Sequence, residues 1–319
     1  MAELDLRPLD VELPFGIRLG GITRAQLQDP ALRARIDELF IEHGMIVFED
    51  VEQSDEMQLA ISACFGPLKE HPVKSIGRVD SKRLPGVIEI RTEPGGGVVE
   101  VEGRRVAHWQ PWHFDHCYNN ELNRAGVLRP VRRTEKDGLT GFLDGVTLYQ
   151  RFPKELLAQI EGEEVVYHLS TNYDDLKFGR PRDYRAITSK QLPPGFKEQA
   201  DAMPRAIHPA VWTRPTADKC LHVSPYMSEG ILGHETAQGD ALLEAVCQVI
   251  NQLAEECSHR HQWVGNEMVA WDNLRMLHCT FGHDPNDSRL MYRTTIKGDY
   301  GLGRWETGNA AREAADAMA

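Results

Sequence analysis

The sequence predicts a β-sandwich or barrel core with helices packed on its outside. Short apolar stretches of strand length recur along the 319 residues, and helical spacing is confined to an early and a late part. Neither an internal repeat nor a clean boundary divides the chain. With 41% hydrophobic and 26% charged residues, the composition is that of a globular protein with a sizeable core. We therefore expect a single domain over residues 1–319.

The first third is predicted to alternate strands and helices. Residues 15–21 indicate a short strand and a turn. Residues 31–43 place apolar side chains at helical spacing, and the glycine that follows can end this helix. Residues 45–48 form a compact apolar strand. A serine suited to N-capping opens a second helix over 54–65, which a Gly-Pro pair ends, and another strand follows at 87–91.

The middle of the chain contains fewer regular patterns. Residues 93–105 are rich in Gly, Val and charge, which suits an exposed mobile segment beside a site or an inert surface loop. A strand is expected at 127–134 and a helix at 148–160. Residues 167–204, which include Asp174-Asp175, are polar and interrupted by Pro and Gly. We interpret them as an insertion that can cover the site as a lid, with disorder as the alternative.

The last third is predicted to contain the most regular patterns of the chain. Its best helix carries an apolar stripe on one face, which is typical of a helix packed against the core. A surface helix, rich in Ala and Glu, is expected after Trp305. The strands are expected at 208–212, 220–223, 268–271 and 290–296, and the apolar-striped helix at 241–257.

Charge and cysteine usage exclude several classes of function. The net charge of −12 argues against non-specific binding of nucleic acid. Neither an N-terminal signal segment nor an apolar run of about 18 residues is present, so no membrane association is expected and a cytoplasmic location is predicted. The six cysteines show no Cys-x-x-Cys pairing, and they are predicted to be free, mostly packed thiols.

The stretch from Trp112 to His116 carries the candidate chemistry. His113 and Asp115 are two positions apart, and on a strand such side chains point to the same face. An imidazole and a carboxylate can then hold one metal ion. This pair is two thirds of the 2-His-1-carboxylate triad that holds Fe(II) and leaves coordination positions open.

A second stretch far downstream completes the set. His278 can supply the third metal ligand from a different strand. Arg289 and Arg293 are four apart on a predicted strand, so they share a face and lie about 13 Å apart along it. An arginine directed into such a core needs an anion, and a guanidinium binds a carboxylate through two parallel hydrogen bonds.

Several motifs together resemble one known family. Over about residues 11–300 the sequence is similar to the Fe(II)/2-oxoglutarate-dependent dioxygenases of the taurine dioxygenase and 2,4-dichlorophenoxyacetate dioxygenase group. That family's fold is a double-stranded β-helix, a distorted jelly roll flanked by helices. The matching segments are Trp112-His113-Phe114-Asp115, Gly138-Leu139-Thr140, Trp271-Asp272-Asn273 followed by His278, the arginines Arg289 and Arg293, and Phe65-Gly66-Pro67-Leu68-Lys69-Glu70-His71-Pro72.

The resemblance implies a reaction and a role for each matching residue. O2 would convert 2-oxoglutarate to succinate and CO2 while a C–H bond of a small organic substrate is oxidised, most simply hydroxylated. His113, Asp115 and His278 would hold Fe(II). Thr140 and Arg293 would bind the 2-oxoglutarate carboxylate distant from the metal, and His71 and Arg289 would contact the substrate.

Some positions depart from the family pattern and bear on the substrate. Phe114 separates the two ligands where polar residues are common, Leu139 replaces an Asp, and His116 replaces a small or apolar residue. Trp109, Trp112, Phe114 and Tyr118 bracket the motif and would suit an apolar or aromatic substrate body. We expect a carboxylate or sulfonate group on that body, bound by Arg289 unless Arg289 instead pairs with Asp284 or Asp287.

Two other functions are compatible with the same residues. One is a zinc hydrolase that uses His113, Asp115 and His278, although Arg293 at its family spacing speaks against it. The other is a jelly-roll binding module without catalysis, against which the complete ligand set speaks. Because Asp115 is present, the halogenating variant of the family is disfavoured. The sequence leaves the identity of the substrate, the reaction outcome and the oligomeric state open, a homo-oligomer included.

Overall fold

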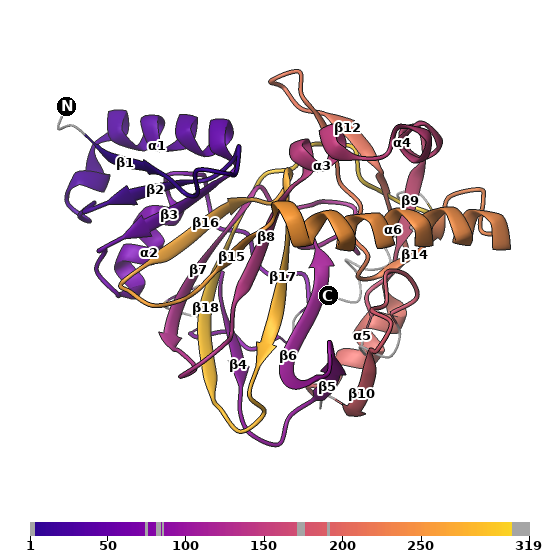
Figure 1. The fold of residues 1–319 in the computed structure, drawn as a ribbon. Helices are drawn as coiled ribbons and strands as arrows, with labels where there is room; N and C mark the ends of the chain where they lie inside the picture. The colour runs from indigo at the N-terminus through magenta and orange to yellow at the C-terminus, as the bar shows by residue number, and fades with distance from the viewer. Residues whose placement is uncertain are drawn as a thin grey trace.

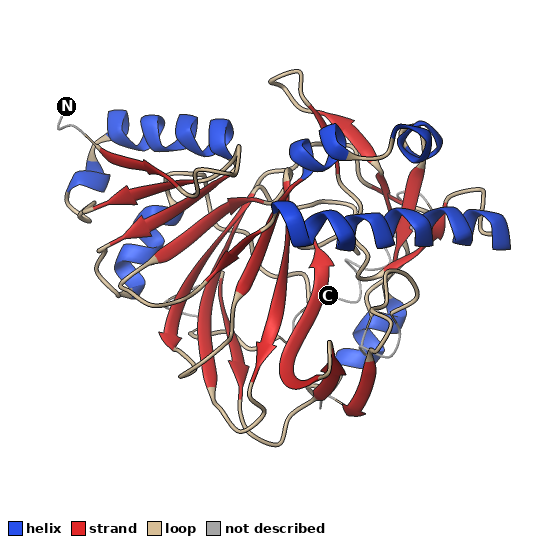
Figure 2. Cartoon of the chain, in the orientation of Figure 1, coloured by secondary structure: helices blue, strands red, loops and turns tan. Residues whose placement is uncertain are grey.

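The protein is described from a computed structural model that covers residues 4–73, 76–80, 84, 86–170, 176–189 and 192–307. Two large sheets face each other and helices cover their outer sides (Figures 1 and 2). This is the predicted jelly roll flanked by helices, and the fold class is confirmed. The helix expected after Trp305 and the pair Asp174-Asp175 lie outside the described residues.

Each site residue that the sequence singled out lies either on one of the two large sheets or in a loop. The seven-stranded sheet has the order β1 (Asp5–Pro8), β2 (Ile17–Gly20), β3 (Met45–Glu49), β16 (Met268–Asp272), β7 (Ala125–Arg132), β18 (Arg289–Ile296), β4 (Val87–Thr92). The six-stranded sheet has the order β10 (Arg185–Thr188), β5 (Val98–Val101), β6 (Arg104–His113), β17 (Met276–His283), β8 (Thr140–Asp144), β15 (His259–His261).

Smaller sheets and helices complete the fold. The four-stranded sheet has the order β14 (Ser228–Ile231), β9 (Glu164–Tyr167), β11 (Ala206–Pro209), β19 (Arg304–Trp305), and β12 (Val211–Thr213) pairs with β13 (Lys219–Leu221). The helices are α1 (Pro30–His43), α2 (Asp55–Ser62), α3 (Gly145–Arg151), α4 (Lys154–Ile160), α5 (Phe196–Ala202) and α6 (Ala237–Cys257), with a short 3-10 turn at Gln26–Gln28.

The central strands of the seven-stranded sheet, β3, β16 and most of β7, are buried on both faces, which explains their continuous apolar runs. On β16, Ala270 packs under the N-terminal helices, whereas the next residue, Trp271, packs inside the sandwich. Trp271 meets Phe142 of the opposite sheet there, with ring centroids 5.8 Å apart. Helices α1 and α2 therefore close the outer face, and the inner faces of the two sheets enclose a second apolar layer.

The predicted helix signals hold at the N-terminus. Asp29 caps α1 by accepting from the N–H of Ala31, and Gly44 ends it in the left-handed region at φ 77°. Ser54 caps α2 by accepting from the N–H of Met57. Gly44 and Ser54 are local signals that the sequence predicted, whereas the Asp29 cap was not predicted and α2 ends at Ser62 instead of residue 65.

The expectation that residues 93–105 form an exposed mobile segment or surface loop is wrong. Residues Val98–Val101 form β5, which returns directly into β6 as a hairpin. The turn is Glu102-Gly103, with φ of 52° and 69°, and two successive positive φ values suit a two-residue hairpin turn. The expected helix 148–160 is two helices, because Pro153 has no N–H with which to continue the first.

The insertion 167–204 contains β10 and α5 among irregular segments. Strand β10 pairs with β5 at the edge of the six-stranded sheet, so the insertion continues that sheet. The six cysteines are all free and buried, as predicted. Among the described residues, no helix is both long enough and apolar enough to cross a membrane.

Candidate active site

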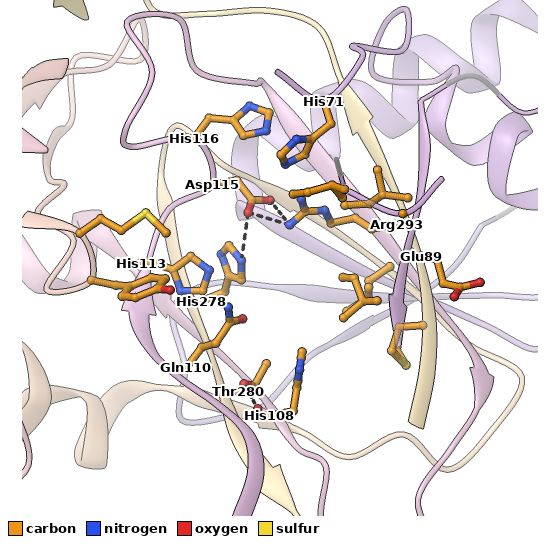
Figure 3. Close-up of a pocket in the computed structure, with 18 of the residues that line it drawn as sticks. His71, Glu89, His108, Gln110, His113, Asp115, His116, His278, Thr280 and Arg293 are labelled. Atoms are coloured by element: carbon orange, nitrogen blue, oxygen red, sulfur yellow. Dashed lines mark hydrogen bonds and ion pairs between the residues drawn. The ribbon is translucent and has the colours of Figure 1, made fainter. Parts of the chain in front are cut away.

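Two histidines face each other across neighbouring strands. His113 is the last residue of β6, and His278 on β17 is its direct Cα partner. Directly paired residues of an antiparallel sheet have neighbouring side chains on one face. Their ring centroids are 4.1 Å apart. With Asp115 they form a group whose potential ligand atoms all lie within 4.8 Å of one another (Figure 3). The structure thus brings the three predicted ligands together.

The predicted strand position of Asp115 is wrong, because β6 ends at His113. Asp115 lies in the following turn, and Asn273 holds it there. The side-chain oxygen of Asn273 accepts from the N–H of Asp115 at 2.7 Å, and its amide donates to the carbonyl of Asp115 at 3.0 Å. The same amide donates to the carbonyl of Asn123 at 3.1 Å. The sequence noted Asn273 as part of a motif but assigned it no role.

Both imidazoles are suited to a metal ion. Nδ1 of His113 lies 2.8 Å from the carbonyl oxygen of Pro111, which can only accept, so Nδ1 carries the proton and Nε2 presents a lone pair. Burial lowers the pKa of His113, and burial followed by the neighbouring His113 lowers the pKa of His278 well below its usual value. Neutral imidazoles and a carboxylate are the donor set of a divalent transition-metal site.

Asp115 is ionised despite its burial. Burial alone would raise the pKa of Asp115, but Arg293 and then His278 hold it below its usual value. One terminal nitrogen of Arg293 lies 2.7 Å and 2.8 Å from the two carboxylate oxygens. Figure 3 shows Asp115 between Arg293 on one side and His278 on the other. The carboxylate therefore carries its charge into the position that a metal ligand needs.

A single cavity of about 430 Å³ between the two large sheets connects these groups. It is large enough for a small organic ligand. All seven residues that the sequence singled out for the site line this cavity. They are His71, His113, Asp115, Thr140, His278, Arg289 and Arg293.

The two arginines occupy different environments on β18. Arg289 is buried and donates to the carbonyl oxygen of Gly138 at 3.3 Å, two residues before Thr140. Burial lowers its pKa to about 10. Among the described residues it forms no ion pair with Asp284 or Asp287, so that alternative finds no support. The structure places Arg289 against Gly138, two residues before Thr140, and Arg293 against Asp115, whereas the family resemblance assigned Arg293 and Thr140 to one carboxylate.

The part of the cavity around His71 combines imidazoles with apolar walls. The rings of His71 and His116 are neighbours in Figure 3, and they meet edge to face with centroids 5.1 Å apart. His71 accepts from the N–H of Val73 through Nδ1, so its neutral ring carries the proton on Nε2. Burial, followed by the positive charge of Arg293, lowers the pKa of His71 to about 3. The sequence gave His116 no role in the site, yet it lines the cavity.

Of the four aromatic residues that bracket the motif, Phe114 and Tyr118 line the cavity. Trp109 instead packs on Tyr184 of the insertion, with centroids 5.3 Å apart. The insertion supplies part of the apolar wall itself, which the sequence anticipated only as a cover. Its contributions are Leu169, Leu192, Pro193 and Phe196.

A His-Asp-His triad inside a jelly roll is typical of non-haem iron oxygenases. The chain belongs to the taurine catabolism dioxygenase TauD, TfdA family, whose model matches residues 6–295. It is accordingly a 2-oxoglutarate-dependent dioxygenase, as predicted.

Individual relatives cover nearly the whole chain. The (S)-phenoxypropionate/alpha-ketoglutarate-dioxygenase of Sphingobium herbicidovorans is 25% identical over 296 residues, which cover 92% of this chain and 95% of that protein. The alpha-ketoglutarate-dependent 2,4-dichlorophenoxyacetate dioxygenase of Cupriavidus pinatubonensis is 26% identical over 272 residues, with 83% and 88% covered. The crystal structure of a taurine dioxygenase from Burkholderia xenovorans superposes with a TM-score of 0.68 at 22% identity, covering 96% of this chain and 94% of that one.

Proposed function

We propose that the protein uses Fe(II), held by His113, Asp115 and His278, to oxidise a C–H bond of a small carboxylate or sulfonate with an apolar body. 2-Oxoglutarate is decarboxylated to succinate and CO2 in the same reaction. The iron, when bound, supplies the redox chemistry with O2. Hydroxylation is the simplest outcome of such a reaction.

The single observation that carries the co-substrate assignment is the buried guanidinium of Arg289 near Thr140. A buried charge without a carboxylate partner is costly, and an anionic ligand removes that cost. Arg289 is 4% exposed, and burial is the cause of its lowered pKa. We therefore assign Arg289 and Thr140, in place of Arg293 and Thr140, to the carboxylate of 2-oxoglutarate distant from the metal.

Arg293 then becomes the candidate for the substrate's anion. It lies beside Asp115 in the cavity, and its Nε has no hydrogen-bond partner among the described residues. His71 presents a ring N–H in the same region and would assist. This exchanges the roles that the sequence suggested for Arg289 and Arg293. The apolar body would lie against Leu169, Leu192 and Phe196.

In this proposal, each residue assigned to the site has a defined role. The histidines and Asp115 orient the metal, while Arg289 and Thr140 fix the far end of the co-substrate so that its other end meets the metal. Arg293 and His71 position the substrate carbon. The insertion limits access of water to the cavity, which suppresses side reactions.

The proposal is tested by oxygen consumption and succinate formation with purified protein. The metal-free protein is loaded with Fe(II) or with Zn(II) and given 2-oxoglutarate. The substrates offered are 2,4-dichlorophenoxyacetate, 2-phenoxypropionate, taurine and dodecyl sulfate, each beside its neutral amide or alcohol analogue. We expect Fe(II)-dependent and 2-oxoglutarate-dependent oxygen uptake, stimulated by anionic compounds. Succinate formation without added 2-oxoglutarate, or equal stimulation by the neutral analogues, would contradict the corresponding part.

A further inference from the structure

Trp263 contacts Thr140, the cavity residue that the proposed function assigns to the co-substrate. It lies in the loop between β15 and β16, and its indole N–H donates to the hydroxyl oxygen of Thr140 at 3.0 Å. Thr140 is 2% exposed and Trp263 is 8% exposed, so water does not compete for this bond. The family resemblance identified Thr140 but gave Trp263 no role.

The direction of this hydrogen bond determines what the threonine can do. An indole N–H can only donate, whereas a hydroxyl has one hydrogen and two lone pairs. Thr140 must therefore accept from Trp263, and its own hydrogen is available to another acceptor. No described side chain or backbone oxygen takes that hydrogen. Thr140 lines the cavity together with Arg289, so a ligand in the cavity can supply that acceptor.

Trp263 is held rigidly enough to impose this direction. Its ring packs inside the sandwich with Leu128, Phe142 and Met291. It meets the ring of His261 edge on, with centroids 4.5 Å apart at an interplanar angle of 82°. His261 is in turn the direct Cα partner of Thr140 across β15 and β8.

The loop that carries Trp263 is fixed by a buried carboxylate. Glu267 accepts from the N–H of Val264 at 2.7 Å and from the N–H of Gly265 at 3.3 Å. The same carboxylate lies 3.6 Å from Nε2 of His261. Glu267 thus joins the loop to strand β15, so the indole and the threonine belong to one rigid unit.

We infer that Trp263 is a positioning residue for the co-substrate, which orients the Thr140 hydroxyl so that its hydrogen points at the carboxylate held by Arg289. This rests on the proposed function, in which Arg289 and Thr140 bind 2-oxoglutarate. Trp263 does not touch the co-substrate in this arrangement. A hydroxyl held in the donating orientation loses less rotational freedom on binding than a free one.

The test is Trp263→Phe, which keeps an aromatic ring in the core but removes the N–H. We expect the KM for 2-oxoglutarate to rise about 5-fold, the effect of losing a hydrogen bond of ordinary strength, with kcat at saturating 2-oxoglutarate almost unchanged. A second readout needs no turnover. The rise in Tm on adding 2-oxoglutarate to the anaerobic Mn(II)-loaded protein should shrink correspondingly.

Trp212→Phe is the matched control. Trp212 is also 8% exposed and donates its indole N–H at 3.0 Å, but to the carbonyl of Leu274, and it does not line the cavity. Its substitution should lower Tm without the ligand by a comparable amount and leave the KM for 2-oxoglutarate unchanged. An equal rise in KM in both variants would show general loosening of the fold and overturn the inference.

A double-mutant cycle with Thr140→Val separates the two proposals. If Trp263 acts through the hydroxyl, Trp263→Phe adds nothing to the KM in the Thr140→Val background. A full additional 5-fold effect there overturns the inference, as does an unchanged KM in Trp263→Phe while Thr140→Val raises it. If Thr140→Val and Arg289→Met both leave the KM unchanged, the proposed co-substrate site itself is wrong and the inference falls with it.

Discussion

The two large sheets contribute different chemistry to one cavity. The six-stranded sheet supplies His113, His278 and Thr140, which are neutral groups that donate lone pairs or a hydroxyl. The seven-stranded sheet supplies Arg289 and Arg293, both on β18 and both cationic. A metal ion suits the first side and anions suit the second. The space between the sheets can therefore hold a chelating dicarboxylate that meets the metal at one end and a guanidinium at the other.

The difference also concerns how each side is stabilised before ligands bind. On the six-stranded sheet, the ligands are fixed by strand pairing and by the carbonyl of Pro111. On the seven-stranded sheet, Arg293 pairs with Asp115, whereas the hydrogen-bond partner of Arg289 among the described residues is the neutral carbonyl of Gly138. Burying the charge of Arg289 costs free energy, and an anionic ligand that binds to Arg289 would offset this cost.

The largest expected effect is the loss of a metal ligand. His278→Ala should lower activity at least about 100-fold and sharply weaken metal binding, because two of three protein ligands remain. Metal content after dialysis and initial rates of succinate formation measure this. His283→Ala is the control, since His283 is buried on the same strand but does not line the cavity. Wild-type activity in His278→Ala would refute the ligand assignment.

The second prediction separates the two arginines. Arg289→Met should raise the KM for 2-oxoglutarate about 30-fold or more, because a charge-assisted contact of about 2 kcal/mol or more is lost. Arg293→Met should instead raise the KM for the organic substrate. Both are measured at saturating metal, because Arg293 also contacts Asp115. The opposite pattern would restore the grouping of Arg293 with Thr140 that the sequence suggested.

The third prediction concerns the ligand that lies off the strand. Asn273→Ala leaves backbone groups of Asp115 and Asn123 without partners, which should cost about 1–3 kcal/mol of unfolding free energy and weaken metal binding. Urea unfolding and metal titration measure the two effects. Asn251→Ala, which removes an amide that bonds Gly179 at 2.9 Å, should affect stability alone. Unchanged metal affinity in Asn273→Ala would show that the turn holds Asp115 without it.

The smallest expected effect is a dependence of stability on pH, which arises from two buried histidines outside the cavity lining. Burial lowers the pKa of His208 to about 4, and burial followed by His208 lowers that of His222 to about 3. These rings stay neutral in the folded protein but take up protons below pH ~6.5 when unfolded. The unfolded state then binds more protons, so stability should fall as pH drops from 6.5 towards 4.

Urea unfolding at pH 7.5, 6 and 5, in the presence of a chelator, measures this dependence. The variant His222→Gln should show a shallower fall over that range, because one of the two rings no longer titrates. A free energy of unfolding that is constant from pH 7.5 to 5 would contradict the prediction, since the buried imidazoles would then not be neutral in the fold.

The sequence by itself determined the features that rest on local spacing. Apolar runs and capping residues predicted α1, α2 and β3, because these patterns follow from the helical and strand periods. The motif around His113 and the distal His278 identified the family and the three candidate ligands that the structure brings together. Residue type and spacing were enough to anticipate this candidate metal site, although Asp115 lies in the turn after β6 and not on the strand. The cysteines likewise followed from composition and spacing.

Only the tertiary structure decided how those residues group in space. Arg289 and Arg293 share one face of β18, so spacing along the chain cannot tell which one meets Thr140. The opposite sheet places the carbonyl of Gly138, two residues before Thr140, against Arg289, and this contact supports the proposed pairing of Arg289 with Thr140. In the same way, Asn273 holds Asp115 and Trp263 holds Thr140 across long sequence separations. Such contacts depend on how two sheets pack, and neither period nor local propensity encodes that packing.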